Sequence, residues 1–168
     1  MDVIADLNLH SKYSRAVSQQ MVIPEIARWA RKKGLGLVGA ADWTHPLWIR
    51  ELKENLIEVS DGVYGWRADP AGPKFLLTTE IASIFSQEGK LRRIHTMVFA
   101  PNFSTAERIN ERLSGRGVNL LADGRPMTGL SVRELAEIVW SVSAEALIVP
   151  SHLWTPWFGT YEIGRAHV

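Results

Sequence analysis

The segment Ile4-Ala-Asp-Leu-Asn-Leu-His-Ser-Lys-Tyr-Ser-Arg15 decides how this chain is interpreted. Polar and apolar residues alternate through its first half, so Asp6, Asn8 and His10 face one side of a strand and the two intervening leucines face the other. Three polar groups side by side at a strand end make a poor core. They make a good metal site.

Further acidic and imidazole groups follow, each close to the end of an apolar run. They are Asp42 and His45, Glu80, His95, and His152. In a parallel barrel the carboxyl ends of the strands lie at the same end of the barrel, and the active site is found there. We therefore expect these groups to converge with those of the first strand.

Strand-like and helix-like segments alternate along the chain, which predicts an α/β fold with a mostly parallel sheet or barrel. Apolar runs predict about five strands, near residues 3–9, 35–41, 75–85, 91–100 and 146–150. Residues 61–74 and 115–129 are rich in glycine or proline and should be loops.

Prolines and capping boxes predict where the helices begin. These positions are Pro24, Pro46, Ser104 and Ser131. The helix from Pro46 should continue through Leu56 and Val59, because these residues extend the helical spacing of Leu52.

Composition narrows the class of protein. The chain has 168 residues, 46% of them hydrophobic, which is enough for one globular domain. A formal net charge of +1 excludes a strongly basic body, so any contact with nucleic acid must rest on a local patch. The absence of cysteine excludes disulfides, thiolate zinc sites and cysteine nucleophiles. Neither a long apolar run nor a secretory signal occurs, so we expect a cytoplasmic protein that does not contact a membrane.

We expect the chain to be an incomplete barrel. Five strands are fewer than a closed barrel usually needs, so an unpaired edge should favour aggregation. Residues 162–168 resemble the translation of a sequencing adapter, although a native polar tail is the alternative. We therefore assign the domain to residues 1–161 and give Glu162 and His167 no function.

The ligand types favour hydrolysis. Imidazole and carboxylate groups without thiolates suit zinc, manganese or iron. A carboxylate such as Glu80 can bridge two metals, which together stabilise the attacking and leaving oxygens of a phosphoester. Two plainer interpretations stay open: His95 as a buried histidine that donates to a carbonyl, and Asp42 as a residue that caps the helix after it.

Five segments, in order, resemble the motifs of the PHP (polymerase and histidinol phosphatase) family, and within it those of endonuclease Q. They are Asp6-Leu-Asn-Leu-His10, Ala40-Ala-Asp-Trp-Thr-His-Pro46, Thr79-Glu-Ile81, Arg92-Arg-Ile-His95 and Val149-Pro-Ser-His-Leu-Trp-Thr-Pro-Trp157. The resemblance implies a distorted (β/α)7 TIM-like barrel, present here in part, with two or three divalent ions (zinc, manganese or magnesium) at its mouth. It also implies nicking of DNA beside deaminated bases or abasic sites.

Carried over by position, the resemblance assigns a role to each motif residue. The metal ligands would be Asn8, His10, Glu80, His95 and His152, and the catalytic residues Asp42 and His45. Two departures weaken the match. Asn8 stands where the family has a histidine, and an amide oxygen binds zinc more weakly than imidazole does. The last family motif, Asp-x-His, is missing.

Several residues beside these ligands are candidates for contact with DNA. The basic residues Lys12, Arg15, Arg92 and Arg93 would contact phosphates, and Trp43, Trp154 or Trp157 would stack on a flipped base. The leading hypothesis is therefore a metal-dependent endonuclease that acts on DNA with deaminated bases in repair, present here as a truncated and inactive piece. The alternatives are a PHP phosphoesterase for a small-molecule phosphate and a non-catalytic binding or scaffold domain.

Overall fold

The computed structural model describes residues 2–161, and the tail assigned to residues 162–168 lies outside them. The described part is a mixed α/β structure with four helices: α1 (Ile23–Lys32), α2 (Pro46–Asn55), α3 (Phe103–Gly115) and α4 (Val132–Val142). Its eight strands are β1 (Ala5–Asp6), β2 (Leu37–Gly39), β3 (Leu56–Ser60), β4 (Val63–Trp66), β5 (Asp69–Gln87), β6 (Lys90–Ala100), β7 (Met127–Thr128) and β8 (Leu147–Pro150).

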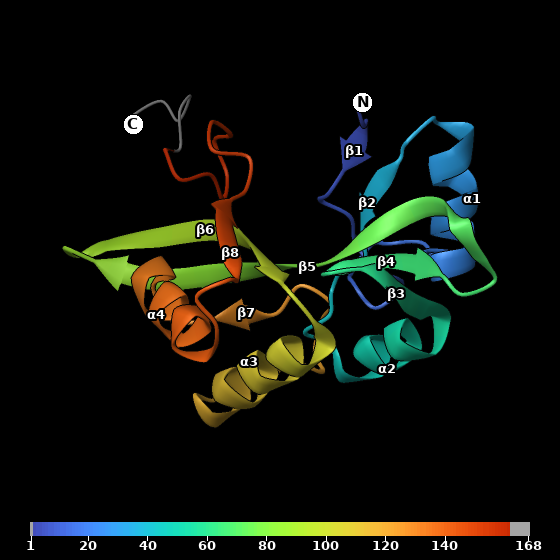
Figure 1. Cartoon of the computed structure of the whole chain (residues 1–168). Coiled ribbons are helices and arrows are strands. Elements are labelled where there is room, and N and C mark those ends of the chain that lie inside the picture. The colour runs from blue at the N-terminus through green and yellow to red at the C-terminus, as the bar shows by residue number, and fades with distance from the viewer. Residues whose placement is uncertain (1, 162–168) are drawn as a thin grey trace.

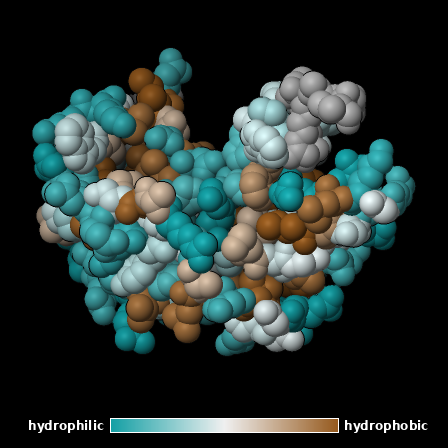
Figure 2. All heavy atoms as spheres, turned by 180° about the vertical axis from the view of Figure 1, so that it is seen from behind, coloured by the Kyte–Doolittle hydropathy of each residue, from teal (hydrophilic) through white to brown (hydrophobic). Residues whose placement is uncertain are grey.

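One long strand, β5, joins two halves of the molecule (Figure 1). Its first part pairs in parallel with β2 and antiparallel with β4, and β1 extends this half beyond β2. From Leu77 onward β5 pairs antiparallel with β6 and in parallel with β7, and β8 extends this half beyond β6. The halves form two lobes separated by a notch (Figure 2). Within residues 2–161, β1 and β8 each have a strand on one side only, so the sheet is open and a closed barrel is not formed.

The prediction of a loop at residues 61–74 is wrong, as is the extension of α2 through Leu56 and Val59. A β-hairpin made by β3 and β4 occupies this region. The α2 helix ends at Asn55, where Arg67 donates from its backbone N–H to the Asn55 carbonyl at 2.7 Å and from its guanidinium to the Leu56 carbonyl at 2.9 Å. Leu56 is already extended, with φ of −102° and ψ of 149°, so the helix does not continue through it.

The first strand is shorter than predicted. Only Ala5 and Asp6 are paired, so Asn8 and His10 lie in the loop that follows β1. Among the helix starts, the capping box at Ser131 is confirmed, with both of its hydrogen bonds present. The start predicted at Ser104 is wrong, because Asn102 caps α3 through its side chain, which accepts from the Thr105 N–H at 2.8 Å.

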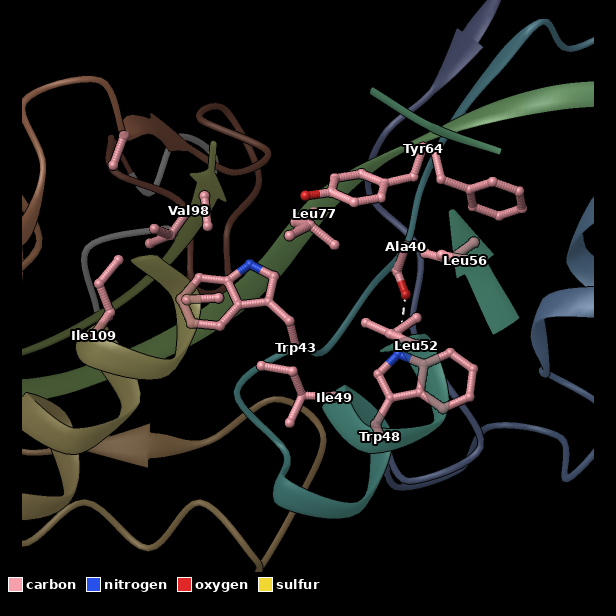
Figure 3. Close-up of a cluster of buried hydrophobic side chains, with 14 of the residues drawn as sticks. Ala40, Trp43, Trp48, Ile49, Leu52, Leu56, Tyr64, Leu77, Val98 and Ile109 are labelled. Carbon is pink, nitrogen blue, oxygen red and sulfur yellow. Dashed lines mark hydrogen bonds between the residues drawn. The ribbon is translucent and has the colours of Figure 1, made fainter. Parts of the chain in front are cut away.

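The core excludes one of the proposed stacking residues. Trp43 and Trp48 are both 0% exposed and lie among the buried aliphatic side chains (Figure 3). The Trp48 indole donates to the Ala40 carbonyl at 2.9 Å. Trp43 fills the core between α2 and α3 and has no face left for a base, so its predicted role in stacking is wrong. No helix among residues 2–161 has both the length and the apolar surface needed to cross a bilayer.

Candidate metal centre

Glu80 is the centre of the site. It lies on β5 just past the point where this strand changes partners, and only 2% of it is exposed. A carboxylate in such a place is costly unless other groups compensate its charge. Burial raises the pKa of Glu80, but contacts led by that of His10 overcome this effect and hold the pKa well below its usual range. The group is therefore an anion surrounded by donors.

Two histidines approach Glu80 from β6 and from the loop after β8. The Nδ1 atom of His95 lies 3.3 Å from one carboxylate oxygen, and Nε2 of His152 lies 3.8 Å from the other. These two nitrogens are 3.1 Å apart, and one potential ligand atom from each of the three residues lies within 4.8 Å of the others. Two imidazoles and a carboxylate are a ligand set that suits zinc or manganese.

The protonation state and orientation of this pair also suit a metal. Burial lowers the pKa of His95 to about 4, so the ring is neutral at physiological pH, as a ligand must be. The other ring nitrogen of His152, Nδ1, lies 2.9 Å from the Thr155 hydroxyl. Such a contact fixes the orientation of a ligating ring.

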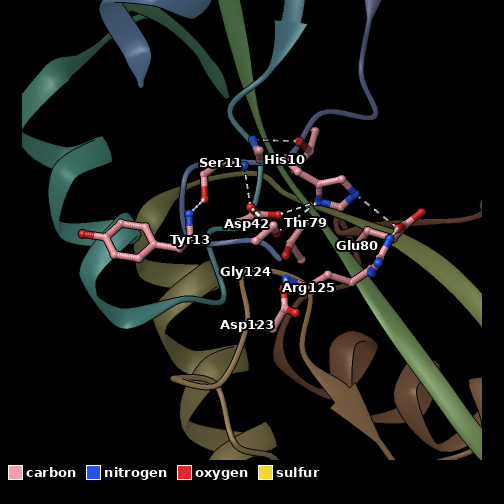
Figure 4. Close-up of polar contacts among 12 residues, drawn as sticks. His10, Ser11, Tyr13, Asp42, Thr79, Glu80, Asp123, Gly124 and Arg125 are labelled. Carbon is pink, nitrogen blue, oxygen red and sulfur yellow. Dashed lines mark hydrogen bonds and ion pairs between the residues drawn. The ribbon is translucent and has the colours of Figure 1, made fainter. Parts of the chain in front are cut away.

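His10 bridges two acids, as Figure 4 shows. Its Nδ1 lies 3.0 Å from an Asp42 oxygen and its Nε2 lies 3.5 Å from Glu80. Burial opposes the charged form, but hydrogen bonds to Asp42 and Glu80 outweigh it and raise the pKa of His10 to about 9. In the metal-free chain this ring is therefore an imidazolium at neutral pH.

Asp42 is held firmly on the far side of His10. It is fully buried and accepts hydrogen bonds from the Ser11 backbone N–H at 2.6 Å and from the Ser14 hydroxyl at 2.9 Å. Its backbone is left-handed, with φ of 39°, and follows Ala41 with φ of 59°. Such conformations cost energy in residues other than glycine and are frequent at functional sites.

The remaining predicted site residues separate into those that reach Glu80 and those that do not. The amide nitrogen of Asn8 donates to Glu80 at 3.3 Å, so the other four predicted metal ligands all approach the Glu80 carboxylate. His45 instead packs in the interior, 4% exposed, with its ring stacked on Tyr13 at 4.3 Å. Burial lowers the pKa of His45. Of the two residues predicted as catalytic, Asp42 is the one that contacts His10.

The basic residues that were predicted to contact DNA come from separate segments of the chain. Lys12 pairs with Glu51 at 2.9 Å, and the largely exposed Arg15 lies 3.5 Å from Asp123. Arg92 and Arg93 are half-buried on β6, upstream of His95.

Two tryptophans in the loop after His152 are exposed. Trp154 is 64% exposed and Trp157 62% exposed. Trp154 stacks on Tyr161 with a distance of 4.8 Å between ring centroids.

Arg125 is the residue that sequence reasoning missed. Its Nη1 lies 3.1 Å from a Glu80 oxygen, closer than either histidine of the β6–β8 half (Figure 4). It comes from the segment 115–129, which has no periodicity and no motif. The one available signal was an arginine between Gly124 and Pro126, too common a pattern to single out.

Comparisons with known proteins show what the chain is similar to as a whole. No protein-family model matches the chain. It is 32% identical over 151 residues to an uncharacterized protein of Methanocaldococcus jannaschii, covering 90% of this chain and 16% of that protein.

Two solved structures are also similar. The lesion-specific endonuclease Q of Pyrococcus furiosus matches with a TM-score of 0.80 and 33% identity, over 95% of this chain and 37% of that one. Endonuclease Q in complex with a 27-mer duplex substrate that has an abasic lesion at the active site matches with a TM-score of 0.81 and 34% identity, over 98% and 38%. In sequence and in fold, this chain is therefore similar to endonuclease Q over little more than a third of that enzyme's chain.

Proposed function

We propose that this chain forms the metal-binding part of a DNA endonuclease of the endonuclease Q type, which hydrolyses phosphodiesters next to deaminated bases. The observation that carries the proposal is the buried carboxylate of Glu80, around which His10, His95 and His152 converge from separate segments. Similarity to an endonuclease bound to damaged duplex DNA supports the reaction class. We propose that such a nuclease acts on DNA in the cytoplasm.

The side chains around Glu80 would have different roles in binding metal. Glu80, His95 and His152 would hold a divalent cation, with zinc, manganese and magnesium as the candidates. A bound cation of this kind supplies a Lewis acid and a water whose pKa is lowered toward neutrality. Asp42 orients His10 toward the same carboxylate, where His10 and Asn8 would complete a site for a second or third ion. The amide at position 8 makes that part of the site weak.

The substrate assignment rests on the surroundings of His152. The exposed faces of Trp154 and Trp157 would stack on a base that has left the helix. Deamination leaves a base mismatched with its original partner, and a mismatched base costs less to unstack than a normally paired one. Lys12, Arg15, Arg92 and Arg93 would contact the phosphates on either side.

Two observations keep a second candidate open. Arg125 and Asn8 both donate to Glu80, so its charge is already partly neutralised without a metal. A non-catalytic binding or scaffold domain would have such a site. A phosphoesterase for a small-molecule phosphate would use the same ligands without a surface for DNA.

Metal binding and cleavage, measured together, separate these functions. We expect Mn²⁺ to bind the chain in isothermal titration calorimetry, Glu80→Gln to abolish binding, and the exposed control Glu88→Gln to keep it. The chain as it stands should not cleave DNA, and Asn8→His should increase nicking of a duplex with a uracil or an abasic site when it is introduced into a version extended to the full length of endonuclease Q.

The other outcomes would contradict the proposal in distinct ways. Metal binding without nicking by the Asn8→His variant would favour the scaffold. Hydrolysis of a generic phosphomonoester, with the damaged duplex left intact, would favour the small-molecule phosphoesterase.

A further inference from the structure

We propose that Arg125 is the residue through which this site binds the phosphate of its substrate. The inference rests on the proposed function and names the contact that positions the scissile group. It starts from the ion pair between the Arg125 guanidinium and Glu80, in which Nη1 lies 3.1 Å from a carboxylate oxygen. The acid is buried, but the arginine side chain is 36% exposed, so the guanidinium lies at the boundary between the metal ligands and solvent.

The segment that carries Arg125 is fixed on both sides of the site. The Gly124 N–H donates to the Tyr13 carbonyl at 3.0 Å, and the Ala82 N–H on β5 donates to the Pro126 carbonyl at 3.0 Å. Asp123 accepts from the Arg125 backbone N–H at 3.0 Å. The arginine is therefore held between the loop that carries His10 and the strand that carries Glu80.

Gly124 permits this approach. A Cβ at this position would collide with the Asp42 carboxylate and the Ser14 hydroxyl. Because glycine has no Cβ, the backbone at Gly124 can lie directly against the groups that orient His10. A surface arginine placed by chance would not need such a close backbone contact.

The chemistry of the guanidinium suits a phosphate. Arginine has five N–H donors, and the hydrogen bond to Glu80 is the one bond that the guanidinium makes within residues 2–161. The other donors can form the paired hydrogen bonds that arginine makes with phosphate oxygens. Lys12 pairs with Glu51 and Arg15 lies beside Asp123, whereas Arg125 is the basic residue paired with the central carboxylate Glu80. A fixed cation beside the metal ligands would also stabilise the charge that develops during phosphoryl transfer.

Two measurements on the whole chain test the assignment. The probe is dimethyl phosphate, a soluble phosphodiester, whose ³¹P relaxation reports binding to the Mn²⁺-loaded protein. We expect Arg125→Gln to weaken binding of dimethyl phosphate about tenfold or more, the usual effect of losing a charge-assisted hydrogen bond. Arg125→Lys should retain part of the affinity, because it keeps the charge and loses the paired donors. The control Arg133→Gln, on the exposed face of α4, should change nothing.

Mn²⁺ affinity distinguishes a binding role from a structural one. Arg125→Gln removes a positive charge next to Glu80, so Mn²⁺ should bind the variant at least as tightly as the wild type. Loss of both Mn²⁺ and phosphate binding would mean that Arg125 only supports the fold, and the inference would be wrong. Equal phosphate affinity in wild type and Arg125→Gln, with Mn²⁺ still bound, would refute this inference and leave the proposed function intact. A wild-type chain that binds no Mn²⁺ would overturn both.

Discussion

Replacing Asp42 with asparagine should change the protonation of His10 in the metal-free chain. His10 has a pKa of about 9: burial works against its charge, and the contacts with Asp42 and Glu80 overcome that effect. The Asp42 contact is the shorter, at 3.0 Å against 3.5 Å for Glu80. Asparagine keeps the size of the side chain and an oxygen that can accept from the Ser11 N–H, but it removes the negative charge.

The expected magnitude follows from the two contacts. An opposite charge at this range raises the pKa of a histidine by about one to three units. Because Glu80 remains, we expect the Asp42→Asn variant to lower the pKa of His10 by about one to two units and not to abolish the whole shift. Each unit corresponds to about 1.4 kcal/mol of preference for the charged ring. The histidine should then titrate between its present value and the ordinary one.

Nuclear magnetic resonance can follow the titration directly. The carbon-bound ring protons of the five histidines would be recorded with a chelator present, from about pH 5 to about pH 10. The His10→Asn variant assigns the signal, and the exposed Asp61→Asn serves as a matched control that should leave it unchanged. A wild-type His10 that titrates near its ordinary pKa would refute the reasoning. So would an Asp42→Asn variant in which the pKa of His10 does not move.

Three further predictions concern the metal, the loop and the sheet edge. If His10 ligates the metal, Mn²⁺ binding near pH 7.5 should release about one proton from its ring. The binding enthalpy measured by calorimetry should then change with the ionisation enthalpy of the buffer. A binding enthalpy that is the same in all buffers would count against ligation by His10. Gly124→Ala should destabilise the fold by about 1–3 kcal/mol in urea unfolding because of its clash with Asp42, whereas Gly129→Ala, which meets open space, should not. Val149→Lys, on the exposed edge of β8, should reduce self-association in sedimentation experiments, because a charged residue discourages pairing at a strand edge. A wild-type chain that is already monomeric would show that this edge does not drive aggregation.

Much of the site could be predicted from the sequence, because each ligand stands near the end of an apolar run. Glu80 and His95 lie on paired strands, and His152 follows a third strand of the same half. Asn8 and His10 both reach Glu80, although they lie in the loop after the two-residue strand β1. The capping box at Ser131 could also be predicted, because its two partners, Ser131 and Glu134, are only three residues apart in the sequence.

The other features of the fold and the site could not be predicted, because they depend on contacts between residues that are distant in the sequence. Leu56 and Val59 fit a helix as well as a strand, and pairing with strand β4 places them in β3. Trp43 belongs to a polar motif, yet packing against the core buries it completely. Arg125 reaches Glu80 across 45 residues from a segment without periodicity. No local pattern encodes such a contact.

The single strand β5 has a mechanical consequence for the site. His10 and Asn8 belong to the β1 half, His95 and His152 belong to the β6–β8 half, and Glu80 sits on the one strand shared by both. Any bending of that strand would alter the separation of the two groups of side chains while the carboxylate stayed at the pivot. If His10 also takes part in binding the cations at Glu80, as proposed above, the bound ions would connect the two lobes, and their uptake should make the whole molecule more rigid.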